Sequence, residues 1–173
     1  MSLIRSSILS LACACISAQA TPFAYVPNEK SGSVSVIDTA SGTAVRQIAA
    51  GKRPRGIAAD PAGTRLYVTD AAANALLVLD AASGETLATI PLGSSPEGVN
   101  ASRDGRWVAV AVEDSNSVAL VDAAARRLVA DIPVQGRNPE HAVFSPDGRW
   151  LLVSAENAEQ VDVIDVPARR QVG

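Results

Sequence analysis

Short apolar runs separated by polar turns follow one another along most of the chain. Two clear examples are residues 75–79 (Ala-Leu-Leu-Val-Leu), between Asn74 and Asp80, and residues 107–112 (Trp-Val-Ala-Val-Ala-Val), between Arg106 and Glu113. Valine-rich runs of this length, bounded by turn residues, are typical of β-strands. Because these runs show no polar alternation, we expect the strands to be buried on both faces.

The pattern of runs and turns repeats along the sequence. The phrase Val-Ile-Asp, or a close variant, ends at spacings of 42, 42 and 43 residues, at Asp38, Asp80, Asp122 and Asp165. The same step separates three glycines and three prolines: Gly63, Gly105 and Gly148, and Pro54, Pro96 and Pro139. A period of ~40–45 residues filled with short strands and turns is typical of β-propeller blades.

Each unit predicts four antiparallel strands, which together form one blade. In the unit that is easiest to follow, the expected strands are residues 97–102, 107–112, 118–121 and 128–134. Gly105 permits the tight turn after the first strand, and Asp122 ends the third strand with an Asx-type turn. The predicted fold is all-β, a partial β-propeller of about 3.5–4 four-stranded antiparallel blades. The expected blades span residues 21–52, 53–94, 95–137 and 138–173.

Both ends of the repeat are incomplete. The first unit begins at Phe23 on its second strand, and the last stops at Gly173, within or just before its outermost strand. We expect the chain to be a fragment of a longer propeller; the alternative is that two copies meet end to end in one ring. Open ends would expose apolar faces and unpaired strand edges, which favour self-association.

Residues 1–20 have the features of a secretory signal peptide. Arg5 supplies the positive charge, residues 8–16 form a short apolar core, and residues 18–20 (Ala-Gln-Ala) fit a cleavage site after Ala20. The alternative is a lipoprotein anchor on Cys13 or Cys15, although the residues before either cysteine fit that pattern poorly. We therefore expect a periplasmic or secreted protein. Its mature chain would contain no cysteine, and hence no disulfide or thiolate metal site.

Charge and motifs exclude several classes of function. Without Arg5, the chain has 14 basic and 18 acidic residues, a net charge of −4. The sequence predicts no clustered basic and aromatic surface of the kind that binds nucleic acids. No further apolar segment is long enough to span a membrane. The sequence has no P-loop, no G-x-G-x-x-G after a strand and no G-x-S-x-G elbow, and it contains a single histidine. We predict that the protein is not an enzyme.

Several segments resemble a known group of propellers. Residues 66–70 (Leu-Tyr-Val-Thr-Asp) resemble the signature of the YVTN-type β-propeller repeat, and residues 144–149 (Phe-Ser-Pro-Asp-Gly-Arg) resemble its turn. More narrowly, residues 51–57 and 138–143 are similar to β-propeller proteins associated with pyrroloquinoline-quinone (PQQ)-dependent catabolism, over the N-terminal part of that family. The resemblance covers the whole mature chain. It implies a periplasmic seven-bladed propeller that works near quinoprotein alcohol oxidation, and it implies no particular reaction.

The loops that lead into the innermost strands of a propeller line the mouth of its central channel. Here they are Pro54-Arg55-Gly56, Pro96-Glu97-Gly98 and Pro139-Glu140-His141. The prolines and glycines serve the fold, whereas the polar residues between them vary. Arg55, Glu97 and Glu140 therefore form a candidate ring for a small anionic or carboxylate ligand, with Arg55 as its anchor. The alternative is a solvated rim with weak ion pairs.

His141 is the sharpest single candidate. It is the only histidine, and it occupies a position that holds glycine in the two preceding units. It is suited to ligate haem or to transfer a proton, and similar haem-bearing propellers use axial histidines. The plainer alternative is that His141 fills a gap beside the channel and bonds to a backbone carbonyl. We predict no other metal ligand and no catalytic residue.

The two ends of the blades differ in the charges that we expect on them. The outer loops on the channel-mouth face contain acidic residues: Glu29, Asp70, Glu113, Asp114, Glu156 and Glu159. The turns on the opposite face contain arginines: Arg65, Arg103, Arg106, Arg126, Arg127, Arg149, Arg169 and Arg170. An acidic face would steer a basic protein partner toward the channel mouth.

The leading functional hypothesis is an exported binding or accessory module of periplasmic quinoprotein alcohol oxidation. It binds a ligand or a protein partner at the channel-mouth face and needs no cofactor. One alternative is a redox propeller that carries haem through His141. Another is a cell-surface propeller that mediates adhesion.

Overall fold

The computed structural model describes residues 23–173, and this part of the chain is built from fifteen β-strands without a helix. The predicted signal peptide, with Cys13 and Cys15, lies outside the described residues. Among residues 23–173 there is no helix long and apolar enough to cross a membrane.

The strands form four separate antiparallel sheets, each of which is one blade. Blade 1 contains β1 (Phe23–Asn28), β2 (Ser33–Asp38) and β3 (Thr43–Ala49). Blade 2 contains β4 (Pro54–Ala59), β5 (Arg65–Asp70), β6 (Ala75–Asp80) and β7 (Thr86–Pro91). Blade 3 contains β8 (Pro96–Ala101), β9 (Trp107–Val112), β10 (Ser117–Asp122) and β11 (Arg127–Pro133). Blade 4 contains β12 (Arg137–Phe144), β13 (Trp150–Asn157), β14 (Val161–Asp165) and β15 (Arg170–Gln171).

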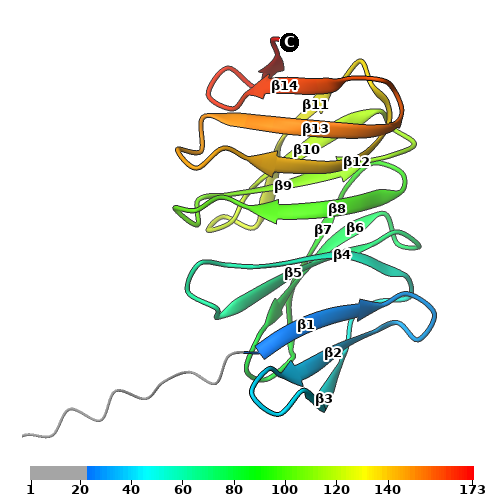
Figure 1. Ribbon diagram of the computed structural model, residues 1–173, viewed down its shortest axis with the longest axis vertical. Coiled ribbons are helices and arrows are strands. Elements are labelled where there is room, and N and C mark those ends of the chain that lie inside the picture. The colour runs from blue at the N-terminus through cyan, green and yellow to red at the C-terminus, as the bar shows by residue number, and fades with distance from the viewer. Residues whose placement is uncertain (1–22) are drawn as a thin grey trace, which may run out of the picture.

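The blades follow one another along the long axis of the molecule, from blade 1 at the bottom of Figure 1 to blade 4 at the top. Within each blade, strands that are consecutive in sequence are neighbours in the sheet. Blade 1 has three strands, and the outermost strand of blade 4 has two residues. The predicted fold, a partial β-propeller, is confirmed.

Repeated turn residues shape the end of the blades opposite the channel mouth. Gly63, Gly105 and Gly148 all adopt positive φ, between 68° and 71°, where glycine avoids the strain of a Cβ atom. The aspartates that end the third strands cap the next turn. Asp38, for example, accepts backbone hydrogen bonds from Ala40 and Ser41. These residues are therefore turn formers, as their recurrence predicts.

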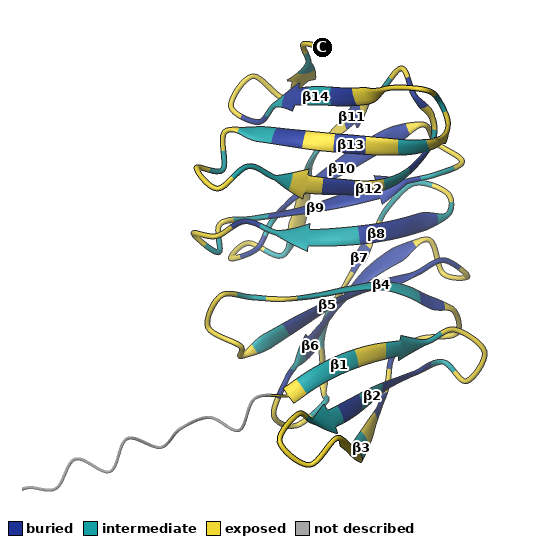
Figure 2. Cartoon of the chain, in the orientation of Figure 1, coloured by how far each residue is buried: buried dark blue, intermediate teal, exposed yellow. Residues whose placement is uncertain are grey.

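The core lies between the blades, where apolar faces stack on one another. One cluster joins Ala109 and Leu120 of blade 3 to Leu151 and Ile164 of blade 4. Figure 2 shows β9 and β10 mostly buried, whereas β13 carries exposed residues. This difference arises because β13 has blade 3 on one side only and nothing over its other face among residues 23–173.

Candidate functional site

The innermost strands β4, β8 and β12 bring the predicted site residues together. Arg55, Glu97, Glu140 and His141 line one small cavity of about 200 Å³ at the channel mouth, with two glycines between them. We call these four residues the channel-mouth site. Glu97 is buried, Glu140 is half-buried and His141 is exposed. Three separate blades therefore supply the site, as the repeat spacing predicts.

Glycine allows the inner strands to approach one another at this level. A Cβ atom on Gly98 would lie 2.5 Å from the backbone oxygen of Glu140 and 2.9 Å from Cδ2 of His141. A Cβ atom on Gly56 would likewise meet the backbone oxygen of Glu97. His141 takes the equivalent position in blade 4, where each of the two preceding blades has a glycine packed against the backbone of the next blade.

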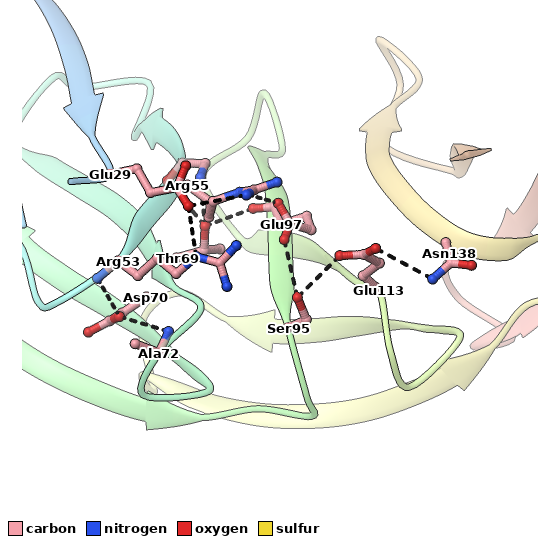
Figure 3. A network of polar contacts seen from close by, with 11 residues as sticks. Glu29, Arg53, Arg55, Thr69, Asp70, Ala72, Ser95, Glu97, Glu113 and Asn138 are labelled. Carbon is pink, nitrogen blue, oxygen red and sulfur yellow. Dashed lines mark hydrogen bonds and ion pairs between the residues drawn. The ribbon is translucent and has the colours of Figure 1, made fainter. Parts of the chain in front are cut away.

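An ion pair between Arg55 and Glu97 forms the centre of the site (Figure 3). Nε of Arg55 donates to Oε2 of Glu97 at 2.7 Å, and Nη1 donates to Oε1 of Glu29 at 3.4 Å. The Glu97 side chain is only 4% exposed, against 30% for Arg55. Glu97 therefore depends on Arg55 for compensation of its charge, because an unpaired buried carboxylate is costly.

Burial and pairing shift the proton affinities of these groups in different ways. Burial raises the pKa of Glu97 above its usual value, and the opposing effects of Arg55 and Ser95 do not cancel this. For Arg55, burial acts to lower the pKa, but the charge and hydrogen bond of Glu97 outweigh it and the pKa is raised. Arg55 is thus a fixed cation, and Glu97 is a carboxylate that binds a proton more readily than usual.

The polar network extends from Glu97 to blade 4. The hydroxyl of Ser95 lies 3.2 Å from both Oε1 of Glu97 and Oε2 of Glu113. A hydroxyl has one proton to donate, so Ser95 serves one carboxylate at a time. Nδ2 of Asn138 donates to Oε1 of Glu113 at 3.4 Å. Figure 3 shows this chain of contacts reaching from Glu29 to Asn138.

Three carboxylates form a second group beside the cavity. Oxygen atoms of Glu113, Glu140 and Glu156 all lie within 4.8 Å of one another. Carboxylate oxygens are the ligands that calcium and magnesium prefer. These residues are therefore the group in the described part of the chain that could hold a metal ion, whereas the sequence predicted none. The repeat could have indicated this group, because Glu29, Glu113 and Glu156 occupy the same position in three units and so lie on the same face.

Two expectations about this face change with the structure. Asp70 is not part of an acidic surface: it is 2% exposed and accepts backbone hydrogen bonds from Lys52, Arg53 and Ala72. It holds the loop between blades 1 and 2.

The second expectation concerns Arg55 as the anchor of a ligand. Two of its three nitrogens already donate to carboxylates, so only Nη2 has no hydrogen bond within residues 23–173. Arg55 retains one nitrogen for a ligand.

His141 is exposed beside Glu140, and its imidazole forms no hydrogen bond with the rest of residues 23–173. The second axial ligand of a haem held by two protein side chains is most often another His, a Met or a Cys. The sequence holds one histidine, and its single methionine and two cysteines all precede residue 23. The described residues can therefore offer a haem one axial ligand of these types.

Comparisons with known proteins agree with this architecture. A family model described as "Lactonase, 7-bladed beta-propeller" matches residues 16–127 and 99–171. No curated protein matches the chain. Among solved structures, the chain is similar to Kuenenia stuttgartiensis hydrazine synthase, with a TM-score of 0.81 and 26% sequence identity. The likeness covers 86% of this chain and 44% of that chain, so this chain spans less than half the length of that relative.

Proposed function

This chain belongs to the lactonase family of seven-bladed β-propellers, and from that premise we propose that its channel-mouth site binds a lactone or the hydroxy acid formed from it. The observation that carries the proposal is the convergence of Arg55, Glu97, Glu140 and His141 on one small cavity. Arg55 supplies a charged donor, and the other three side chains supply acceptors. A polyhydroxy lactone or acid needs both kinds of partner.

The charges around the cavity favour a ligand that is rich in hydroxyl groups. Arg53 and Arg55 pair with Glu29 and Glu97. Three further carboxylates, of Glu113, Glu140 and Glu156, gather beside the cavity, so acidic groups outnumber guanidinium groups here. A ligand with several negative charges would be repelled by this surplus of carboxylates. A single carboxylate or lactone carbonyl can instead bond to Nη2 of Arg55, while hydroxyl groups donate to Glu140 and neighbouring acids.

The proposed setting is an exported accessory module of quinoprotein alcohol oxidation. This part of the proposal rests on the predicted signal peptide and on the resemblance to propellers associated with PQQ-dependent catabolism. Oxidation of the hydroxyl group of a cyclic hemiacetal yields a lactone, so an alcohol oxidation of this kind would supply the proposed ligands. A propeller that binds them would act immediately downstream of the oxidation.

Hydrolysis of the lactone is a second candidate function, favoured by family membership. His141 would take a proton from water, and the resulting hydroxide would add to the lactone carbonyl carbon. The ring C–O bond would then break, and the proton would pass to the leaving oxygen to give the hydroxy acid. Arg55 is placed to stabilise the oxyanion. The prediction that the protein is not an enzyme opposes this candidate.

Calorimetric titration of the full chain with gluconate and with δ-gluconolactone tests the proposal. We expect saturable binding that weakens about two- to tenfold in His141→Gly, since a lost hydrogen bond costs roughly 0.5–1.5 kcal/mol. Glu159→Gln, an exposed change outside the cavity, is the matched control. Absence of saturable binding, or equal affinity in His141→Gly, would contradict the proposal. Acid release above the spontaneous rate, lost in His141→Gly, would select hydrolysis.

A further inference from the structure

A larger crevice lies between blades 3 and 4, at the end of the strands opposite the channel mouth. It has a volume of about 610 Å³ and is lined by turns of both blades, with Arg106, Arg149 and Arg169 among its residues. Glu97 and Glu140 lie near the start of β8 and β12, whereas this crevice lies beyond their other ends. A six-residue strand spans about 20 Å, so the two sites are separate.

Two arginines of this crevice are stacked on tryptophans. The guanidinium carbon of Arg106 lies 4.7 Å from the ring centroid of Trp107, and Arg149 and Trp150 repeat this geometry at 4.7 Å. Both pairs come from the sequence Asp-Gly-Arg-Trp, which occurs in blades 3 and 4, whereas blade 2 has Ala-Gly-Thr-Arg at residues 62–65. Stacking fixes each guanidinium and leaves the donors in its plane free for an anion.

The aspartates that line the crevice do not neutralise these arginines through contact. Oδ1 of Asp104 accepts bonds from Ser102 Oγ at 2.6 Å and from the backbone of Arg106 at 3.0 Å. Asp147 repeats these bonds with Ser145 and the backbone of Arg149. The ion pairs found within residues 23–173 all lie at the channel mouth, so Arg106, Arg149 and Arg169 form no direct ion pair. Asp104, Asp147 and Asp165 line the crevice beside them without such contact.

Positive charge is concentrated at this end of blades 3 and 4. Their four turns, residues 102–107, 122–127, 145–150 and 165–170, contain seven arginines and four aspartates, a net charge of +3. The turns at the same end of blades 1 and 2, residues 38–43, 60–65 and 80–86, contain one arginine and four acidic residues, a net charge of −3. The expected basic face is therefore present on blades 3 and 4, whereas the same end of blades 1 and 2 is acidic.

We propose that the crevice is a second binding site, for a small molecule that carries at least two carboxylate or phosphate groups. One anionic group would bond to Arg106 and another to Arg149, and Arg169 would supply a third cation. A volume of this size suits a small organic ligand. Val166 and Pro167 add an apolar wall for the carbon skeleton. All of these residues belong to blades 3 and 4, whose shared core fixes their relative position.

Calorimetric titration of the full chain with citrate and with pyrophosphate tests this proposal. The double variant Arg106→Lys/Arg149→Lys keeps the net charge but removes the planar fork, and we expect its affinity to fall at least about tenfold. Arg65→Lys, at the same end of blade 2, should bind as the unmodified chain does. Binding of citrate alone would identify carboxylates as the ligand groups, and binding of pyrophosphate alone would identify phosphates.

Two results would overturn the proposal. One is the absence of saturable binding by either probe up to about 10 mM, a concentration well above the dissociation constant of a specific site. The other is equal affinity in the lysine double variant, which would show a diffuse charge effect. Arg169→Gln gives an independent check if the double variant melts at a lower temperature, because Arg169 is exposed. It should weaken binding and leave the melting temperature unchanged.

Discussion

At the scale of single residues, Glu97 links the channel-mouth site to the pH dependence of stability. Burial raises its pKa above the ordinary value of 4.5, so the folded chain holds this proton more tightly than the unfolded chain. The protonated Glu97 carboxyl therefore stabilises the folded chain. This stabilisation is complete below pH 4.5 and is lost as the pH rises through the folded-state pKa of Glu97. We expect the free energy of unfolding to fall over this range relative to that of Glu97→Gln, which does not titrate.

Urea unfolding of the two chains from acidic to neutral pH measures this difference. Glu159→Gln makes the same substitution at an exposed glutamate and is the matched control. A constant difference between the unmodified chain and Glu97→Gln would show that the Glu97 carboxyl has its ordinary proton affinity.

The repeat predicts where the site residues lie, but it does not predict their contacts. Arg55, Glu97 and Glu140 follow a fixed proline in each unit, so equal spacing places them on neighbouring inner strands. The bond from Arg55 to Glu29 joins residues 26 positions apart, in different blades, and depends on side-chain conformations that the spacing does not contain. Asp70 was misplaced for a similar reason: a loop from the preceding blade folds over it and supplies amide donors.

At the scale of elements, the close approach of β8 and β12 makes a specific demand on Gly98. Gly98→Ala would place Cβ 2.5 Å from the backbone oxygen of Glu140, which cannot rotate away. We expect a loss of about 1–3 kcal/mol in unfolding free energy, typical of overpacked sites. As a comparison, His141→Gly introduces the glycine that the preceding units have at this position. It should lower the unfolding free energy by about 1 kcal/mol or less. Equal stability of Gly98→Ala and the unmodified chain in urea would refute this contact.

The loop between β3 and β4 depends on one buried carboxylate. Asp70 accepts three backbone hydrogen bonds, from Lys52 at 2.9 Å, Arg53 at 3.0 Å and Ala72 at 3.1 Å. Asp70→Ala removes all three, and we expect a loss of about 2–4 kcal/mol because these amides lose their acceptor. Asp114→Ala, at an exposed acid on the same face, is the control for urea unfolding. A similar small loss in both variants would show that the loop is held by other contacts.

At the scale of the whole molecule, the sequence predicts the succession of antiparallel blades, but not the distribution of charge. Turn-forming aspartates recur in every unit because the fold needs them, whereas the arginines accumulate only in blades 3 and 4. The net charge of each half therefore follows from residues that differ between units. The Arg–Trp crevice likewise requires two blades to be packed together before its volume exists.

The uncovered face of blade 4 predicts how the chain behaves in isolation. Leu152 is 49% exposed and Val161 is 57% exposed, whereas Ala109 and Val118, their equivalents in blade 3, are fully buried by the next blade. An apolar face of this kind favours association with a second copy. We expect the chain to self-associate with increasing concentration in sedimentation velocity experiments.

Leu152→Glu/Val161→Glu should shift this equilibrium toward the monomer, because two carboxylates on the contact surface oppose its burial. The same double variant should melt close to the unmodified monomer, since neither side chain packs against blade 3. Val45→Glu, at an exposed site on the outermost strand of blade 1, is the matched control for added charge. If the unmodified chain stays monomeric, or if both variants associate equally, the face of blade 4 is not the contact surface. Self-association that only the blade 4 variant abolishes would mean that the apolar layer between blades, rather than the hydrogen bonding of strand edges, drives the assembly of this propeller.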